Sequence, residues 1–376
     1  LRLGFGGGGT DLPAYYERHG GLVVSSAISA ACHVRLKEHP GNDVLIHSLD
    51  YRKSTIVPAR QAISLEAPLS LPRAVLQWFE QVTRRPSGII LTMEADVPPG
   101  SGLGSSSAMT VALVSAIASH LRIPLLKTEI AAAACEIEID ILGHPIGRQD
   151  QYAAALGGLN LLTFTSGGVT AESLNLPAEI ERSLQDHLLL FSTQRTRNSA
   201  SVLLEQRKAS SSDSEVIARL DRIKSLAHRM ADALREGDIA GFGRLLDESW
   251  QLKRKLATGV TSAEIDRWYA MAQELGAYGG KIAGAGGGGF LLLCAPVALR
   301  STISQVLQRE GLRPLPVTFN HKGCRAVKEA VGYSRRDDRA WKQETYNAAL
   351  LTQSWPTVAL AAGRLLARSG PSRRGG

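Results

Sequence analysis

A short segment rich in glycine and serine carries the clearest chemical signal in this chain. Gly100, Gly102 and Gly104 alternate with other residues, three serines follow, and an apolar run at helical spacing continues to residue 121. A helix start presents unpaired N–H groups and the positive end of the helix dipole, and glycine lets the backbone approach a ligand closely. The sequence therefore predicts a phosphate site formed by Pro99, Gly100, Ser101, Gly102, Leu103, Gly104, Ser105, Ser106 and Ser107. A plain N-capped helix after a flexible turn is the alternative.

The spacing of this segment excludes two common nucleotide-binding loops. No Gly-Lys-Ser/Thr sequence is present, so the segment is not a Walker A loop, and glycines at 100, 102 and 104 do not fit G-x-G-x-x-G. No lysine of the segment can therefore supply countercharge. If phosphates bind here, backbone amides, a metal ion and charges from elsewhere must hold them.

Carboxylates follow on an expected helix over 128–142, for which Thr128 is the predicted N-cap. Glu136, Glu138 and Asp140 cannot all face the same side of a helix, so each is either solvated or a ligand. Asp150 stands on a glycine-flanked connection a few residues later. It is either a functional carboxylate or the capping residue of the next short helix.

Two further glycine-rich segments lie far from the first in the chain. Gly6 to Gly9 follow an expected strand over 1–5 and precede Thr10 and Asp11, and residues 284–289 precede a strand over 290–294. Each glycine costs roughly 1 kcal/mol relative to alanine in regular structure. The first run therefore indicates a ligand-facing loop, since the alternative, a flexible linker, does not fit a position directly between a strand and the amphipathic segment 12–19. The second run indicates close packing against a ligand or another backbone.

Composition narrows the classes of function. The formal net charge is +8, but arginines are concentrated in the last 42 residues, and the 5% of aromatic residues are scattered, so nucleic acid is not an expected partner. The four cysteines lack C-x-x-C spacing, which indicates a reduced, cytoplasmic protein. No apolar run is long enough for a membrane span, and no signal peptide is recognisable. Residues 331–376 are expected to form a basic, appended or disordered tail.

Hydrophobic periodicity predicts a mixture of helices and strands, hence an α+β protein with two lobes. Strands are expected at 1–5, 22–36, 44–48, 54–57, 88–95, 158–164, 188–192, 290–294 and 313–319. Helices are expected at 12–19, 74–83, 105–121, 128–142, 213–235, 239–256, 262–275 and 298–310. The helices at 213–235 and 239–256 are amphipathic, and their charged faces are predicted to face solvent.

Taken together, the three glycine-bearing segments resemble the motifs of the GHMP kinase family of small-molecule kinases. Residues 98–108 resemble its phosphate-binding second motif, and 281–290 resemble its third. The opening residues 2–13 depart from the Gly-Glu-His form of the first motif and are similar to the Gly-Gly-Gly-Thr-Asp form of the sugar-kinase branch, in particular that of heptose 7-phosphate kinases. The resemblance extends to about residue 330.

This resemblance implies a role for individual residues. Ser106 and Glu138 match the Mg²⁺ ligands, Asp150 matches the catalytic aspartate, and Arg2 matches the basic residue beside it and the transferring phosphate. Arg197, and less certainly Arg195, resembles a position suited to gripping a sugar phosphate. The implied substrate-binding residues are Gly8, Gly9, Thr10, Asp11, Arg197, Gly286, Gly287 and Gly288, and Gly286 to Gly289 are expected to pack beside the phosphate segment.

The resemblance also implies a fold and a reaction. The fold would be the two-lobed GHMP architecture, with lobes over 1–170 and 171–330, and the reaction would be ATP-dependent, Mg²⁺-assisted phosphorylation of the anomeric hydroxyl of D-glycero-D-manno-heptose 7-phosphate. A kinase for a fucose- or galactose-like sugar is the nearest competitor. A non-catalytic sensor of sugar or ATP is a further alternative, disfavoured because Ser106, Glu138 and Asp150 are all present. A dinucleotide-dependent oxidoreductase is disfavoured by the glycine spacing. The oligomeric state is not predicted.

Overall fold

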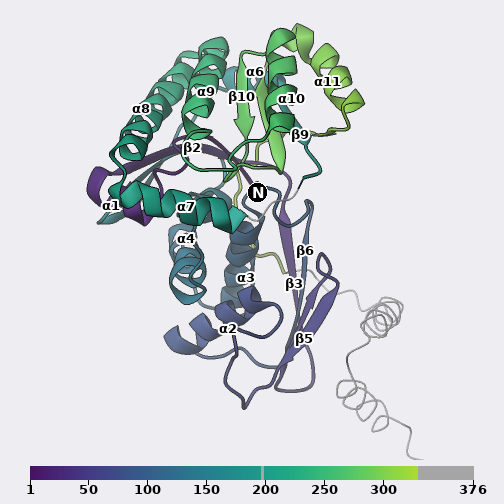
Figure 1. Ribbon diagram of the computed structural model, residues 1–376. Coiled ribbons are helices and arrows are strands. Elements are labelled where there is room, and N and C mark those ends of the chain that lie inside the picture. The colour runs from purple at the N-terminus through teal and green to yellow at the C-terminus, as the bar shows by residue number, and fades with distance from the viewer. Residues whose placement is uncertain (196–198, 329–376) are drawn as a thin grey trace, which may run out of the picture.

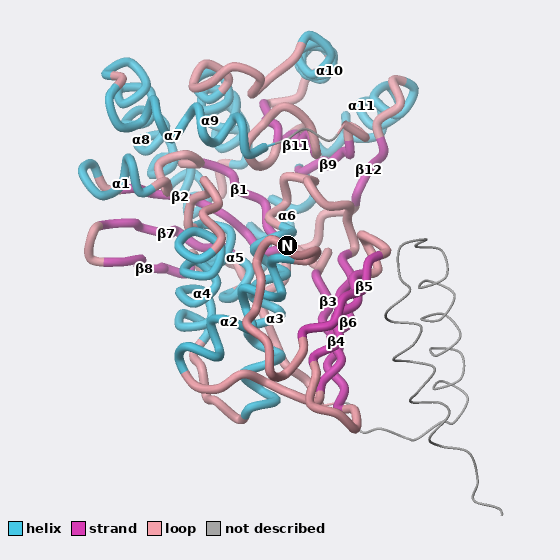
Figure 2. Tube along the Cα trace, turned by 60° about the horizontal axis from the view of Figure 1, so that its bottom comes forward, coloured by secondary structure: helices cyan, strands magenta, loops and turns pink. Residues whose placement is uncertain are grey.

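Three four-stranded sheets organise the computed structural model, which describes residues 1–195 and 199–328 (Figure 1 and Figure 2). The first sheet, in the order β1-β2-β7-β8, is antiparallel and contains β1 (Arg2–Gly6), β2 (Gly21–Ala27), β7 (Leu159–Thr165) and β8 (Gly168–Ser173). The second, also antiparallel, contains β10 (Gly279–Ile282), β11 (Phe290–Cys294), β9 (Leu188–Ser192) and β12 (Arg313–Leu315). The third contains β3 (Cys32–Glu38), β6 (Ile89–Ala95), β4 (Val44–Ser48) and β5 (Lys53–Val57), with β4 and β6 parallel.

The first sheet lies between two hydrophobic cores, which explains the continuous apolar sequence of β2. All seven residues of β2 are buried. Leu22 and Val24 join the core shared with α8 (Ser214–Glu236) and α9 (Ile239–Lys253), whereas Val23 joins the core that contains α3 (Ser105–Leu121). Because successive side chains of a strand point to opposite faces, this sheet connects the two halves of the molecule.

The third sheet and its helices position the glycine-serine segment. Strand β6 ends at Ala95, the segment follows, and α3 begins at Ser105 and ends at Leu121, as the periodicity predicted. Helix α3 is buried along most of its length, with α2 (Ser70–Val82), α4 (Lys127–Cys135) and α5 (Gln149–Leu156) packed against it (Figure 2). The rigid core of this half therefore fixes the start of α3.

The second sheet lies in the other half of the molecule. One face packs against α8 and α9, and the other against α10 (Ala263–Glu274) and α11 (Arg300–Arg309) (Figure 1). Around these elements lie α1 (Pro13–His19), α6 (Ala178–His187), α7 (Ser199–Ser212) and a short 3₁₀ turn, Val297–Leu299. The third glycine segment joins β10 to β11, so both of its ends are held in one sheet.

The expected helix over 128–142 differs from the structure in two respects. It begins at Lys127, because the Glu129 carboxylate accepts a hydrogen bond from the backbone N–H of Leu126, so Thr128 is not the N-cap. It also changes at Glu136 into a π-helical turn, Glu136–Ile141. Such turns widen the helix and re-aim side chains, and they are frequent at functional sites.

Other departures concern elements with weak local patterns. Helices α6 and α7 and strands β8 and β10 were not expected, and α2 begins four residues earlier than predicted. The strand expected over 313–319 is shortened to β12, after which Phe319 forms only an isolated bridge with Ile28.

Two expectations about chain organisation concern the lobe boundary and the C-terminal tail. The lobe boundary at 170 stays a prediction, and β8 spans that position. The tail over 331–376 lies outside the described residues. Among the helices of the described ranges, none has both the length and the apolar character that a membrane span requires.

Candidate active site

The glycine-serine segment, residues 99–107, is here called the phosphate segment, and its three glycines have a backbone conformation that other residues rarely adopt. Gly100, Gly102 and Gly104 have φ of 74°, 77° and 72°. A Cβ on Gly102 would lie 2.6 Å from the carbonyl oxygen of Ala283, and one on Gly104 would lie 3.2 Å from Asp150 Oδ2. Glycine is required here because the segment turns in the left-handed region while another backbone and a carboxylate press against it.

The third glycine segment packs against this turn through Gly289, which was among the residues expected, and through Gly284, which was not. A Cβ on Gly284 would lie 2.8 Å from the Cα of Gly102, and one on Gly289 would lie 2.3 Å from the carbonyl oxygen of Ser101. Gly286 and Gly288 face the backbones of Val260 and Arg195 instead. The packing predicted for Gly286 to Gly289 is thus made by Gly284 and Gly289, and contact of Gly286, Gly287 and Gly288 with a substrate stays a prediction.

The substitution Gly289→Ala tests this backbone packing. The left-handed φ of +86° and the clash with Ser101 should together cost about 2–5 kcal/mol of stability, measured by denaturant unfolding. Gly311→Ala is a matched control, because Gly311 has φ of +88° but open space around the position of a Cβ, so only the backbone strain applies. Equal losses in the two variants would contradict close packing of the two segments.

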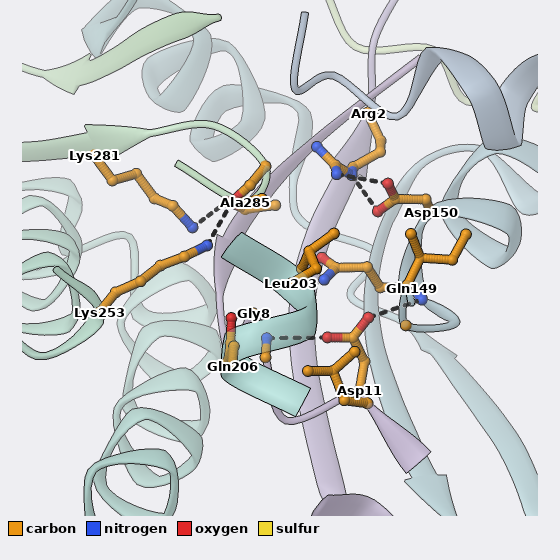
Figure 3. A pocket seen from close by; sticks show the side chains of 16 residues that line it. Arg2, Gly8, Asp11, Gln149, Asp150, Leu203, Gln206, Lys253, Lys281 and Ala285 are labelled. Carbon is orange, nitrogen blue, oxygen red and sulfur yellow. Dashed lines mark hydrogen bonds and ion pairs between the residues drawn. The ribbon is translucent and has the colours of Figure 1, made fainter. Parts of the chain in front are cut away.

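Arg2 and Asp150 form a bidentate ion pair beside the phosphate segment (Figure 3). Arg2 Nε lies 2.6 Å from Asp150 Oδ1 and Nη2 lies 2.7 Å from Oδ2, while Nη1 donates to the carbonyl oxygen of Gly102 at 2.7 Å. The side chain of Arg2 is 5% exposed, but that of Asp150 is 23% exposed and lines a cavity. The guanidinium therefore fixes the carboxylate in one orientation and attaches it to the phosphate segment.

Glu138 is the one buried carboxylate of the π-helical turn. Its Oε1 accepts a hydrogen bond from Ser106 Oγ at 2.7 Å, and its Oε2 accepts one from Gln151 Nε2 at 2.8 Å. Burial raises the pKa of Glu138 to about 7, with the hydrogen bonds opposing that shift. Glu136 and Asp140 are exposed, Glu136 accepting from the indole of Trp78. The interpretation that these carboxylates face different sides is therefore correct.

The residues around Glu138 fit a Mg²⁺ ion. The available donors are a hydroxyl and a carboxylate oxygen at a helix start, the ligand type that Mg²⁺ prefers. A buried carboxylate with no cation beside it is costly, which is the condition that a bound ion relieves. Within residues 1–195 and 199–328, no group of three or more His, Cys, Asp or Glu residues could form a complete protein cage. This composition suits Mg²⁺, which commonly takes its remaining ligands from phosphates and water.

The opening motif contributes a second buried carboxylate. Asp11 accepts hydrogen bonds from the backbone N–H of Gly9 at 3.0 Å and of Gln149 at 3.3 Å. Burial, reinforced by the charge of Asp150, raises the pKa of Asp11. Thr10 is fully buried, and its hydroxyl donates to the carbonyl oxygens of Gly7 and Leu22. A substrate contact for Thr10 stays a prediction.

These groups line two cavities on either side of the phosphate segment. The first, here called the Asp150 cavity, is lined by Gly8, Gly9 and the side chains of Arg2, Asp11, Gln149, Asp150, Gln206, Lys253 and Lys281 (Figure 3). The second, here called the Ser106 cavity, has a volume of about 340 Å³ and is lined by Gly100, Ser105 and Ser106 together with residues of β4 to β6 and α2. The two cavities share no lining residue, but Arg2, which lines the first, donates to the carbonyl oxygen of Gly102 in the phosphate segment, and Ser106 of that segment lines the second.

Four polar residues of the Asp150 cavity were missed by the sequence reasoning. Lys253 lies on α9, whose charged face was assigned to solvent, yet it is 7% exposed and donates to the carbonyl oxygen of Gly284 at 2.6 Å. Burial and the charge of Arg2 lower the pKa of Lys253 to about 8. The others are Gln149, Gln206 and Lys281. Lys281 is the first residue of the stretch 281–290 that resembles the third motif, and this position was the only sequence signal for it.

Of the two arginines expected to bind a sugar phosphate, only Arg195 is among the described residues, and it does not line this cavity. Arg197 lies outside the described residues, so its role stays a prediction. The guanidinium of Arg195 is 62% exposed and pairs with Glu264 at 3.1 Å.

Comparison with known proteins places this geometry in a family. The model of the GHMP kinases N terminal domain matches residues 70–158, and that of the GHMP kinases C terminal matches 230–308. The D-glycero-alpha-D-manno-heptose 7-phosphate kinase of Campylobacter jejuni subsp. jejuni serotype O:2 is 31% identical over 328 residues, which cover 87% of this chain and 96% of that protein. The chain belongs to the GHMP kinase family. The family and the α+β fold predicted from the sequence are thereby confirmed.

Two further relatives of this GHMP kinase extend the comparison. A crystal structure of D-glycero-D-manno-heptose 1-phosphate kinase from Bacteroides thetaiotaomicron has a TM-score of 0.74 and 27% identity, covering 89% of this kinase and 98% of that chain. The L-fucokinase/L-fucose-1-P guanylyltransferase of Bacteroides fragilis is 27% identical over 362 residues, covering 86% of this kinase and 37% of that protein. GHMP kinases are phosphotransferases that use ATP as the phosphate donor. The residues matched by the two family models include both glycine segments that meet at Gly102 and Gly284.

Proposed function

We propose that this GHMP kinase transfers the γ-phosphoryl group of ATP to the anomeric hydroxyl of D-glycero-D-manno-heptose 7-phosphate. The observation that carries the proposal is the bidentate Arg2–Asp150 pair, which borders the Asp150 cavity and also contacts the carbonyl oxygen of Gly102 in the phosphate segment. Identity of 31% to a heptose 7-phosphate kinase over most of both chains supports the choice of acceptor.

In this proposal ATP occupies the Ser106 cavity, and its phosphates lie against the start of α3. The helix dipole and the free N–H groups of the first turn favour the phosphate charge. Ser106 and Glu138 would hold a Mg²⁺ ion, which offsets charge on the phosphate oxygens. The Ser106 cavity supports this arrangement because it adjoins the phosphate segment and is lined largely by apolar side chains, such as Met93, that could pack against a base.

The acceptor then occupies the Asp150 cavity. Asp150 would accept the proton of the attacking hydroxyl or orient that hydroxyl, and Arg2 would offset charge that develops on the transferring phosphate. Asp11 lines the same cavity and is available to accept a hydrogen bond from another sugar hydroxyl. The chain's four cysteines are free, which is consistent with a reaction in the reducing cytoplasm.

A substrate screen tests this function. ATP consumption is measured with phosphorylated and free heptoses and hexoses, with Asp150→Asn as the inactive control. The account predicts the highest kcat/KM with heptose 7-phosphate and loss of turnover in the variant. Equal or greater activity with an unphosphorylated sugar would favour the competing function, a kinase for a free sugar such as fucose, to which the 27% identity with the Bacteroides fragilis protein points.

A further inference from the structure

Two buried lysines in the Asp150 cavity lack an acidic partner in the described part of the chain. Lys253 is 7% exposed and Lys281 is 5% exposed, and neither forms a salt bridge there. Lys253 Nζ donates only to the carbonyl oxygen of Gly284, whereas Lys281 Nζ donates to those of Gly4 at 2.8 Å and Phe5 at 3.2 Å. An ammonium group has three donors, so Lys253 retains two and Lys281 retains one. Burying such charge without an anion is costly.

A further unused donor lies on the same side of the cavity. Gln206, on α7, is 2% exposed, and its Nε2 is buried with no hydrogen-bond partner. The position of a Cβ on Gly9 lies 2.2 Å from this nitrogen, and that of a Cβ on the neighbouring Gly8 lies 3.4 Å from Lys253 Nζ. The ammonium of Lys253 and the amide of Gln206 therefore converge on the Gly8-Gly9 turn, where the absence of side chains lets both groups approach the backbone.

The carboxylates of the cavity have partners other than the two lysines. Both oxygens of Asp150 are bound by Arg2, and Asp11 accepts from the backbone amides of Gly9 and Gln149. Figure 3 shows Lys253 and Lys281 across the cavity from the Arg2–Asp150 pair. The side of the cavity remote from Asp150 thus carries two cations and an amide donor without a matching anion.

We infer that Lys253 and Gln206, with Lys281 behind them, bind the phosphate group that the acceptor already carries, remote from its reacting hydroxyl. This inference rests on the proposed function, and it identifies the residues by which the kinase would select a phosphorylated sugar over a free one. A phosphate dianion accepts several hydrogen bonds at once, which matches the three unused donors on the lysines and the two on the Gln206 amide. The γ-phosphate of ATP is the other phosphate group that these donors could bind. Lys253, however, lines the Asp150 cavity and not the Ser106 cavity.

The substitution Lys253→Met tests this assignment, since it removes the charge and retains the bulk of the stem. The ratio of kcat/KM for heptose 7-phosphate to kcat/KM for free heptose should fall by roughly 10- to 100-fold, and the KM for ATP should stay near that of the wild type. Gln206→Leu should lower the same ratio by roughly 5- to 30-fold. Lys224→Met is the matched control, because Lys224 also donates to backbone carbonyls but lines neither cavity, so its ratio should not change.

Binding without turnover separates this inference from the proposed function. Inorganic phosphate is titrated calorimetrically into the full chain with Mg²⁺ and a non-hydrolysable ATP analogue filling the Ser106 cavity. Wild type should bind phosphate, and Lys253→Met should not, even if no heptose proves to be a substrate. Equal phosphate binding by wild type and variant would overturn the inference. The inference would also be overturned if Lys253→Met kept the wild-type ratio of kcat/KM for heptose 7-phosphate to kcat/KM for free heptose but had a raised KM for ATP. That result would assign Lys253 to the γ-phosphate.

Discussion

Asp150→Asn is expected to lower kcat with heptose 7-phosphate by about 10²- to 10⁴-fold, the range typical of a lost general base. The amide keeps the size of the side chain and one oxygen for Arg2, but it cannot take up the proton of the attacking hydroxyl. The KM for ATP should change little, because Asp150 lines the Asp150 cavity and not the Ser106 cavity. Initial rates, together with calorimetric binding of the ATP analogue, measure both quantities.

Asp140→Asn is the matched control for that substitution. Asp140 is an exposed carboxylate on the π-helical turn, two residues after Glu138, so the Asp140→Asn variant should retain wild-type kcat. A kcat for Asp150→Asn within a few-fold of wild type would contradict the assignment of Asp150 to the reacting hydroxyl.

Glu138→Gln is expected to lower kcat/KM for Mg·ATP by about 10²- to 10³-fold, the cost of removing one group that stabilises charge during transfer. The thermal stability of the ligand-free protein should not decrease, because the substitution removes a buried carboxylate whose burial is costly. The remaining oxygen can accept from Ser106, and Gln151 can turn its unpartnered Oε1 toward the new amide N–H. Opposite effects on activity and stability distinguish a metal ligand from a structural residue. The measurements are a Mg²⁺ titration of the rate and a thermal melt.

Glu136→Gln provides the comparison for the metal site. Glu136 lies two residues before Glu138 on the same turn, but it is exposed and accepts a hydrogen bond from the indole N–H of Trp78. Its substitution should leave the Mg²⁺ dependence unchanged. Glu138→Gln with a normal Mg²⁺ dependence, or with a large loss of stability, would contradict a role in holding the ion.

Local sequence was sufficient to predict the elements that carry strong patterns. The helix at 105–121 was predicted with its bounds, because glycines end the preceding segment and apolar residues repeat at helical spacing. The choice of Glu138 over its neighbours came from the family resemblance. The π-helical turn that re-aims these side chains depends on tertiary packing and has no signal in spacing alone.

The rest of the site depended on contacts between residues that are distant in the chain. Lys253 has the pattern of a solvated residue on an amphipathic helix, and only the docking of α9 against the third glycine segment buries it. Likewise, composition cannot tell which glycines of residues 284–289 meet the phosphate segment, because Gly284 and Gly289 are selected by the register in which the two halves pack.

Phosphorus NMR of the reaction mixture tests the central claim most directly, since it locates the phosphoryl group that leaves ATP. With ATP, Mg²⁺ and D-glycero-D-manno-heptose 7-phosphate, the account predicts ADP and a new phosphate ester at the anomeric position, with the 7-phosphate intact and no such product from Asp150→Asn. ATP hydrolysis to free phosphate without a sugar ester, or an ester at another hydroxyl, would contradict it.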